Sequence, residues 1–335
     1  MKKLKPSWGR TFLLSGNFNF GCLNKSTVFT EETLAKVKLG TSPLSNRLVR
    51  HETISAYLFL LPFLLFFIMF VVYPMFMCVF TSFFDATMGR DDIFIGFGNY
   101  KTLFQDEVFW IALRNTLVIV LVSVPITCFF SLWVASVISK MHVAATSAFR
   151  CIFYLPVVTG SVAVAMVWKW MYNNYYGVFN YIGTSTGLLE SNINWLGDPR
   201  FALGCIILIL LTTSVGQPIV LYVSALDNVD KSLIEAAKVD GATSLMAFWK
   251  VKWPQMMPTT LYILVITTIN SFQCFALIQL LTLGGPSNST MTIMYYIYYN
   301  AFKLFKYGYG NAMGVILAII IAVLSAVQFK LGQEK

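Results

Sequence analysis

Charged residues are scarce in this chain. Only 12% of its 335 residues are Asp, Glu, Lys or Arg, and 57% are hydrophobic, whereas soluble domains carry about a quarter charged residues. This balance excludes a soluble globular protein and predicts an integral membrane protein. The formal net charge is +9. The basic residues flank apolar runs and form no patch interleaved with aromatic residues, so we expect no nucleic-acid binding.

Metal-binding and disulfide chemistry is equally sparse. The two histidines, His51 and His142, lie far apart in the sequence and flank different apolar runs, so we expect no shared metal site. The six cysteines include no CxxC pair and mostly lie inside apolar runs. We therefore interpret them as small buried hydrophobic residues rather than disulfides or metal ligands.

Catalytic motifs are also missing. No GxxxxGK[ST] sequence occurs, so the chain has no phosphate-binding loop of that type. No Ser–His–Asp or paired-carboxylate arrangement is visible in an apolar run, and we expect no enzyme activity from this chain alone. Ion-coupled carriers usually place ionisable residues in the middle of a span. The second to sixth apolar runs have no ionisable residue near their middles, and Arg114, Arg150 and Lys169 all lie near the ends of runs. This favours an external energy source.

Long apolar runs dominate what is present. A run of about 20 residues can cross the bilayer as a helix, and this pattern predicts an all-α membrane protein with six spans. Residues 1–54 would form a basic N-terminal tail, and 331–335 the C-terminus. Residues 291–306 are aromatic but short and carry two lysines, so we expect them on the outer surface. The six predicted spans are about 54–83, 110–139, 149–172, 202–226, 259–282 and 311–330.

The basic residues predict the orientation. With six spans, both termini lie on the same side of the membrane. Of 24 Lys and Arg residues, 17 fall in the tail, the second connection, the fourth connection and the C-terminal end. Only five fall in the three alternate connections. Because positive charge concentrates on the cytoplasmic side, we expect both termini in the cytoplasm.

The fourth connection, residues 230–258, is unusually elaborate. Asp230 is placed to cap a helix that continues through Glu235. Gly241 should end that helix, because glycine readily adopts the left-handed conformation favoured at helix C-termini. A second helix would begin at Thr243 or Ser244 and stop before Pro254. A connection that only joined two spans would not need two helices. An interfacial helix pair lying on the lipid headgroups is the alternative interpretation.

This loop resembles the EAA loop of permease subunits in binding-protein-dependent ABC importers. Further stretches resemble the maltose-type sugar permeases, namely 94–104, 114–125, 153–158 and 275–286. The resemblance covers roughly residues 55–330 and implies the type I ABC importer permease fold. The loop positions that match are Glu235, Ala236, Ala237, Asp240, Gly241, Ala242, Phe248, Val251 and Pro254.

The resemblance also implies partners and a location. A second, similar permease would form a heterodimer with this chain in the bacterial cytoplasmic membrane, and an extracellular solute-binding protein would deliver a sugar. The helix from Glu235 to Asp240 would contact a groove of a partner ATPase dimer, which would bind ATP and Mg. This chain itself would bind no cofactor. The maltose permease has two additional spans and a large extracellular insertion, and this chain has neither.

Uncharged polar residues interrupt two of the predicted spans. Thr267, Asn270 and Ser271 are spaced i, i+3, i+4 and share one helix face. Amide and hydroxyl groups both donate and accept hydrogen bonds, which suits sugar hydroxyls. Tyr222 and Phe272 are aromatic neighbours that could stack on a sugar ring. The predicted substrate path consists of Thr213, Ser214, Gln217, Thr267, Asn270, Ser271 and Gln273.

Several alternatives stay open at this point. The polar groups could instead join the helices, as Ser, Thr, Asn and Gln commonly do in membranes. In the maltose importer only one of the paired permeases holds the sugar, and this chain resembles that one. Relatives of this size carry disaccharides, oligosaccharides or glycerol phosphate, so a polyol or glycerol-phosphate importer is possible. A secondary carrier and a membrane anchor for an extracellular binding protein are the other classes.

Overall fold

The computed structural model describes residues 43–333, and side chains from 53 to 332. Most of the predicted tail therefore lies outside the described residues, as do residues 334–335. By its internal contacts the chain divides into residues 1–66 and residues 67–335.

The first helical run begins earlier than the sequence predicts. Helix α2 (Pro43–Phe67) begins within the predicted tail, while the part of the run that is long and apolar enough to cross a membrane, Thr53–Thr81, agrees with the predicted first span. The run continues as a π-helix, η1 (Ile68–Val72), and then as α3 (Tyr73–Thr81). Pro74 lies in the first turn of α3, where its missing N–H costs no regular helical hydrogen bond. The Asn311 side chain donates a 2.6 Å hydrogen bond to Thr81 and links α3 to α16 (Tyr307–Gln333).

A small polar lobe follows α3. Strands β1 (Phe84–Asp85) and β2 (Ile93–Phe94) pair antiparallel, and α4 (Gly98–Gln105) follows them. The buried Asn99 side chain donates to the carbonyl oxygens of Ser82 and Phe84, at 2.8 and 2.9 Å. The lobe is therefore fixed to the end of α3 by hydrogen bonds from one amide.

Helix α5 (Glu107–Ile138) is the longest helix and matches the second predicted span. Asp106 caps it by accepting a 2.9 Å hydrogen bond from the Val108 amide. The same carboxylate accepts hydrogen bonds from the hydroxyls of Tyr296 and Tyr309, at 2.5 and 2.6 Å. Partial burial acts to raise the pKa of Asp106, but these hydrogen bonds outweigh it and the pKa lies below its ordinary value. One carboxylate thus joins α5, α16 and the segment before α16.

The third and fourth predicted spans are both bent. The third consists of α6 (Val143–Val158) and α7 (Ser161–Met171), which meet at 93°. The third predicted span, 149–172, is therefore broken near residue 159, and the sequence analysis did not predict the break. The fourth consists of α9 (Ala202–Ser214) and α10 (Gly216–Asp227), bent by 41°. Gly216, at the bend between α9 and α10, lies directly against α6. If a Cβ atom were added to this glycine, it would stand only 2.3 Å from the carbonyl oxygen of Phe153 in α6. Helix α8 (Val178–Ser185) lies in the segment that connects α7 to α9.

Gly216 supplies the first testable prediction. Gly216→Ala should lower the thermal unfolding midpoint of the purified chain, because overpacking a tight contact costs about 1–3 kcal/mol. Gly204→Ala is the matched control, since an added Cβ there meets nothing within 4 Å. Alanine is also the better helix former by about 1 kcal/mol. The control should therefore leave the midpoint unchanged or raise it. Equal midpoints for both variants would contradict the close contact.

The loop between the fourth and fifth spans has the two predicted helices. They are α11 (Lys231–Val239) and α12 (Ser244–Ala247). The predicted stop before Pro254 was wrong, since η2 (Phe248–Lys252) continues directly into α13 (Trp253–Phe272). In this π-helical turn the N–H of Trp253 bonds to the carbonyl of Phe248. The wider turn accommodates proline at the start of α13, where its lack of an N–H is tolerated.

The fifth predicted span, 259–282, is also divided. Helix α13 ends at Phe272, and the short α14 (Ala276–Leu281) follows after a break. The segment 291–306 contains α15 (Ile293–Tyr298) and η3 (Tyr299–Lys303). It does not form a full span, but the expectation that it lies on the outer surface was wrong for much of it. Its buried residues include Met291, Ile293 and Tyr295.

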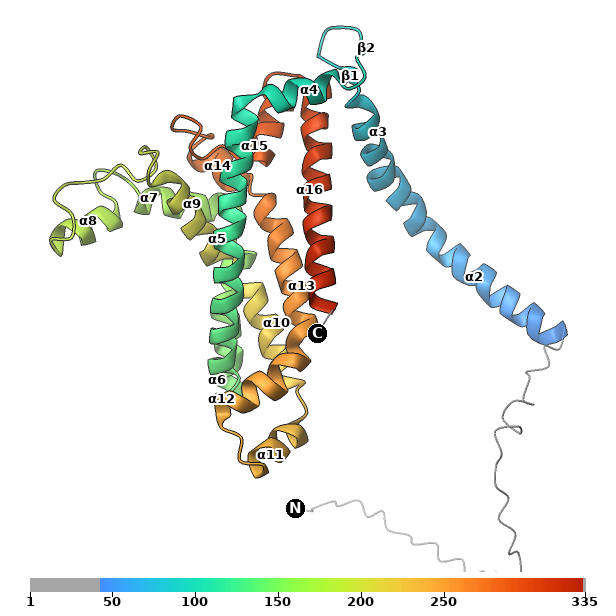
Figure 1. Cartoon of the computed structure of the whole chain (residues 1–335), viewed down its shortest axis with the longest axis vertical. Helices are drawn as coiled ribbons and strands as arrows, with labels where there is room; N and C mark the ends of the chain where they lie inside the picture. Colours follow the sequence, from blue (N-terminus) through green and yellow to red (C-terminus); the bar gives the residue numbers. More distant parts are fainter. Residues whose placement is uncertain (1–42, 334–335) are drawn as a thin grey trace, which may run out of the picture. The chain divides into compact units, whose positions relative to one another are not determined.

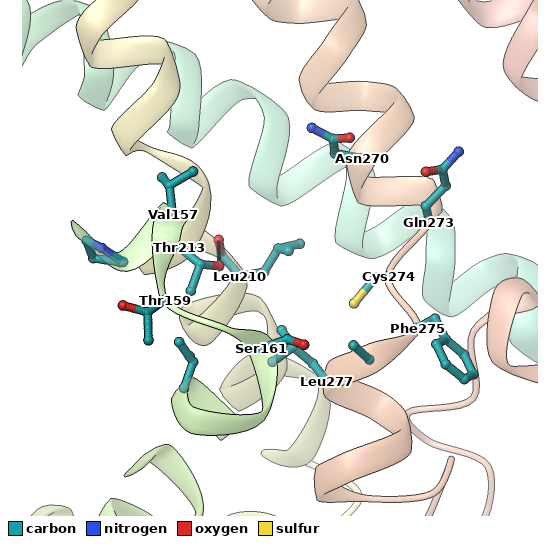
Figure 2. A pocket seen from close by; sticks show the side chains of 13 residues that line it. Val157, Thr159, Ser161, Leu210, Thr213, Asn270, Gln273, Cys274, Phe275 and Leu277 are labelled. Carbon is teal, nitrogen blue, oxygen red and sulfur yellow. Dashed lines mark hydrogen bonds between the residues drawn. The ribbon is translucent and has the colours of Figure 1, made fainter. Parts of the chain in front are cut away.

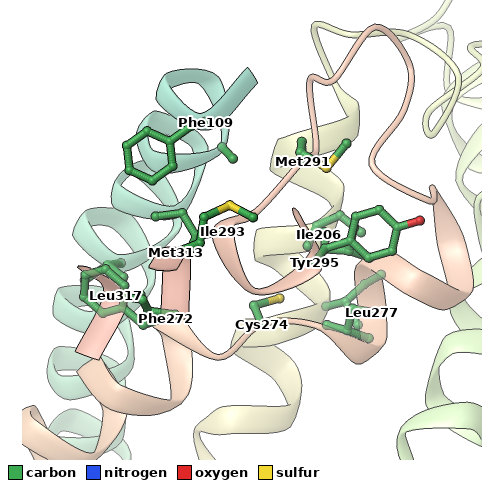
Figure 3. Close-up of a cluster of buried hydrophobic side chains, with 14 of the residues drawn as sticks. Phe109, Ile206, Phe272, Cys274, Leu277, Met291, Ile293, Tyr295, Met313 and Leu317 are labelled. Atoms are coloured by element: carbon green, nitrogen blue, oxygen red, sulfur yellow. The ribbon is translucent and has the colours of Figure 1, made fainter. Parts of the chain in front are cut away.

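The main core explains why that segment is buried. Figure 3 shows Met291, Ile293 and Tyr295 packed among side chains of other helices, including Phe109 of α5. Helix α13 packs against both α5 and α16 (Figure 1). A second cluster joins α5, α10 and α13 around Tyr222 and Met256. These contacts fix the helices that carry the polar residues discussed next.

Candidate functional site

The bends of the third and fourth spans lie beside a hollow. Its volume is about 350 Å³, and α6, α7, α9, α13 and α14 contribute to its lining. Figure 2 shows Thr213 and Asn270 on its walls, with Gln273 beside the break after α13. Thr159 and Ser161 line the same hollow from the bend between α6 and α7.

Two further hollows continue from the first. Thr213 and Asn270 also line a second hollow of about 130 Å³, together with Ser214, Gln217 and Thr267. Gln217 in turn lines a third, of about 480 Å³, beside Arg150 and Tyr154. Because neighbouring hollows share lining residues, they lie side by side, and polar side chains stand among the apolar ones that line them. We call this row of hollows the path. The Arg150 guanidinium makes a 2.8 Å ion pair with Asp227 at the far end.

The side-chain amides on this path are not engaged by the protein. Among the side chains that the structure describes, Gln217, Asn270 and Gln273 form no side-chain hydrogen bond to another residue. An amide offers two N–H donors and a carbonyl acceptor. By contrast, a hydroxyl group on the path bonds to its own helix: the Thr213 hydroxyl donates to the carbonyl oxygens of Ile209 and Leu210. The three amides are therefore the groups best placed to bind a polar solute.

Six of the seven predicted path residues are brought together, and Ser271 is not. The Ser271 hydroxyl lies 3.0 Å from the Ser123 hydroxyl of α5 and is 3% exposed. It joins two helices, as the packing alternative predicted. Tyr222 and Phe272 are both 0% exposed and line none of the three hollows, so the expectation that they stack on a sugar ring was wrong.

Sequence reasoning missed Thr159 and Ser161. They reach the path only because the chain turns by 93° between α6 and α7. The available signal was Thr159-Gly160 shortly after Pro156 in an apolar run, since Pro and Gly mark helix boundaries. A continuous span through 149–172 hides that signal.

The loop helix α11 is capped at both ends by its own residues. The Asp230 carboxylate accepts a 2.9 Å hydrogen bond from the Ser232 amide, which lowers the pKa of Asp230. At the other end Gly241 has φ +81°, the left-handed conformation. The amide of Ala242 donates to the Ala237 carbonyl and the amide of Gly241 to Lys238. These two bonds form a Schellman motif and end the helix sharply.

The surface of the loop is open. None of the residues of α11 is buried, and Glu235, Ala236 and Asp240 are exposed, while Ala237 and Ala242 are half-buried. Among the described side chains, Glu235 forms no ion pair.

Two apolar residues stand out on the same loop and were not predicted from sequence. Val239 is 88% exposed and Leu245 is 70% exposed. Apolar side chains beside an unpaired carboxylate favour contact with another protein. A partial signal was available for Val239, because it lies one turn after Glu235 and so on the same face of the predicted helix.

Within residues 53–332, no group of three or more His, Cys, Asp or Glu side chains is placed to hold a metal ion.

Known proteins share this architecture. Residues 51–333 match the family described as "Binding-protein-dependent transport system inner membrane component". The lactose transport system permease protein LacF of Rhizobium radiobacter is 32% identical over 291 residues, covering 86% of this chain and 97% of that protein. The multiple sugar-binding transport system permease protein MsmF of Streptococcus mutans is 32% identical over 268 residues, covering 80% and 91%.

A solved structure agrees on the fold. It is a bacterial alginate ABC transporter in complex with an alginate pentasaccharide-bound periplasmic protein, with TM-score 0.72 and 25% identity. The match covers 86% of this chain and 96% of that chain. The predicted type I ABC importer permease fold is confirmed. Together with the family match over residues 51–333, this shows that the chain is a multi-pass membrane permease of the binding-protein-dependent transport family.

Proposed function

We propose that this chain is a transmembrane subunit of an ATP-driven importer and passes a di- or oligosaccharide along the path from Thr159 to Gln217. The observation that carries the proposal is the set of three unengaged amides, Gln217, Asn270 and Gln273, which line neighbouring hollows. Such groups match the alternating donors and acceptors of sugar hydroxyls. The names of LacF and MsmF, which refer to lactose and to multiple sugars, support the sugar class.

The proposed partners follow from the loop and the family. The exposed surface around Glu235, Val239 and Leu245 would seat in one subunit of an ATPase dimer, which holds ATP and Mg. A second permease would complete the membrane unit as a heterodimer. An extracellular solute-binding protein would deliver the sugar, as the family description and the alginate complex suggest.

The proposed orientation places both termini and the loop 230–258 in the cytoplasm. The support is the excess of Lys and Arg on that side, 17 against five. A single cysteine at exposed Val239 should be labelled only from the cytoplasmic side, and one at exposed Tyr181 only from outside. The reverse pattern would overturn both the orientation and the coupling role.

Two alternatives fit the site less well. A phosphorylated polyol would require positive groups, yet among the described side chains Arg150 is the only cationic one that lines the three hollows, and it is paired with Asp227. An ion-coupled secondary carrier would also require ionisable groups along the path. A simple membrane anchor would not need unengaged amides lining hollows between its helices.

Co-isolation tests the proposed function. The full chain, purified under mild conditions from cells that express its natural partners, should retain a nucleotide-binding ATPase and a second permease in fixed proportion. An anchor or a secondary carrier would retain neither. Recovery of an active, solute-transporting chain alone would overturn the proposal.

A further inference from the structure

An ion pair joins the third and fourth spans close to the loop 230–258. The Arg150 guanidinium of α6 lies 2.8 Å from the carboxylate of Asp227, the residue that ends α10. The two residues are 77 positions apart in the sequence, so the pair is a tertiary contact. In the described part of the chain the one other ion pair joins Asp198 to Arg200, only 2 positions away. Arg150 and Asp227 therefore form the ion pair that connects two of the described helices.

The pair is partly open to water. The Arg150 side chain is 31% exposed and the Asp227 side chain 55%, and ion pairs as exposed as this one stabilise a fold only weakly. The Nε–H group of the same guanidinium is buried and donates to no atom in the described part of the chain. Burying a donor without an acceptor costs free energy. Stability alone therefore does not explain why Arg150 is held here.

Arg150 also belongs to the wall of the path. Together with Cys151 and Tyr154 it lines the third hollow from α6, and Gln217 lines that hollow from α10. Further along α6, Val157 lines the first and second hollows. A displacement of α6 relative to α10 would therefore change the shape of all three hollows.

The Asp227 end of the pair is connected to α11 by a short segment. Only residues 228–230 separate α10 from α11. Within this segment Val229 is 5% exposed and belongs to the second cluster, and Ile234 of α11 packs against the same cluster. A connection this short, with a buried residue in it, leaves α11 little freedom to move without the end of α10.

The two ends of α10 contact α6 in different ways. At the start of α10, Gly216 lies against the backbone of Phe153. At its end, Asp227 is paired with Arg150. The two contacts are about 16 Å apart along the helix at 1.5 Å per residue. The ion pair thus holds the end of α10 that is nearest the loop, and the glycine contact holds the end that is nearest the bend.

We propose that the Arg150–Asp227 pair carries the movement of the 230–258 loop to the wall of the path, with Asp227 as a positioning residue. The inference rests on the proposed function, because it links the loop that would seat in the ATPase to the hollows that would hold the sugar. When the ATPase displaces α11, Asp227 moves with the end of α10 and draws Arg150 and α6 with it. Asp227 itself lines none of the three hollows. Its loss should therefore change how much sugar is carried for each ATP hydrolysed rather than how tightly the sugar binds.

The number of sugar molecules taken up per ATP hydrolysed, measured at saturating sugar in the reconstituted complex, tests the proposal. Asp227→Asn keeps the size of the side chain and removes its charge. It should lower this ratio about two- to fivefold, the factor that one exposed ion pair supplies, and leave basal hydrolysis unchanged. Asp227→Glu keeps the charge and should keep the ratio. Asp198→Asn is the matched control, because it breaks the ion pair with Arg200 and should leave the ratio unchanged.

A double-mutant comparison separates the pair from its two residues. Arg150→Gln should lower the ratio by the same factor, and its combination with Asp227→Asn should lower it no further, because both changes remove one contact. A pair that only stabilised the fold would lower the thermal unfolding midpoint and leave the ratio of the folded complex unchanged. That result, or equal ratios in Asp227→Asn and Asp227→Glu, would overturn this inference alone. A wild-type complex without ATP-driven uptake would overturn the proposed function, and this inference with it.

Discussion

Glu235→Ala is expected to reduce ligand-stimulated ATP hydrolysis by at least tenfold while the permease stays folded and inserted. Glu235 is exposed on α11, forms no ion pair among the described residues and lies one turn before Val239. A hydrogen bond to a charged group contributes about 1.5–3 kcal/mol, a factor of roughly 10 to 150. The measurement compares ATPase rates with and without the loaded binding protein in the reconstituted complex.

Glu190→Ala is the matched control for this experiment. It removes an exposed glutamate from the 173–201 segment, away from the loop, and should leave stimulation intact. Gly241→Val tests the end of the helix separately. An added Cβ there meets no atom within 4 Å, so any loss would come from placing a β-branched residue at φ +81°. Normal stimulation and uptake in both loop variants would remove the coupling role from this loop.

Asn270→Ala combined with Gln217→Ala is expected to lower sugar uptake by about tenfold or more. Both amides line the second hollow and neither is engaged by another side chain or backbone group in the described part of the chain. Each neutral hydrogen bond contributes about 0.5–1.5 kcal/mol. The loss of two such bonds to the sugar would therefore lower uptake by about tenfold or more. Assembly with the ATPase and basal hydrolysis should stay normal. Initial uptake rates across a range of sugar concentrations provide the measurement.

Ser271→Ala separates binding from packing. The Ser271 hydroxyl contacts Ser123, and Ser271 lines none of the hollows. The Ser271→Ala variant should therefore change thermal stability more than it changes uptake. Asn270→Ala should show the opposite pattern. Unchanged uptake kinetics and sugar specificity in the Asn270 and Gln217 variants would place the sugar site in the partner permease. The polar stripe would then serve helix packing alone.

The loop and the straight spans could be predicted from sequence because their signals are local. Asp230 and Gly241 act as a cap and a left-handed terminator through their own neighbours, and α5 follows a long, mainly apolar run. Hydrophobicity alone does not reveal bends, because a broken span is as apolar as a straight one. The turn between α6 and α7 was therefore missed, and Thr159 and Ser161 with it.

Tertiary contacts account for the other errors. Periodicity places Thr267, Asn270 and Ser271 on one helix face, but that face is wide enough to meet both the path and α5. Ser271 faces α5 because Ser123 lies opposite. Pro254 does not stop the helix because a π-helical turn precedes it, and no local residue signals that turn. The lysines of 291–306 suggested a surface segment, yet the residues between Met291 and Tyr295 complete the core.

ATP-driven uptake in proteoliposomes tests the central claim most directly. The full chain is reconstituted with its co-isolated permease and ATPase, the binding protein and radiolabelled sugar are added on the binding-protein side, and ATP is supplied on the ATPase side. Our account predicts accumulation against a gradient that requires ATP and the binding protein and that falls at least about tenfold in Glu235→Ala. Uphill uptake by this chain alone, driven by an ion gradient without ATP, would contradict it.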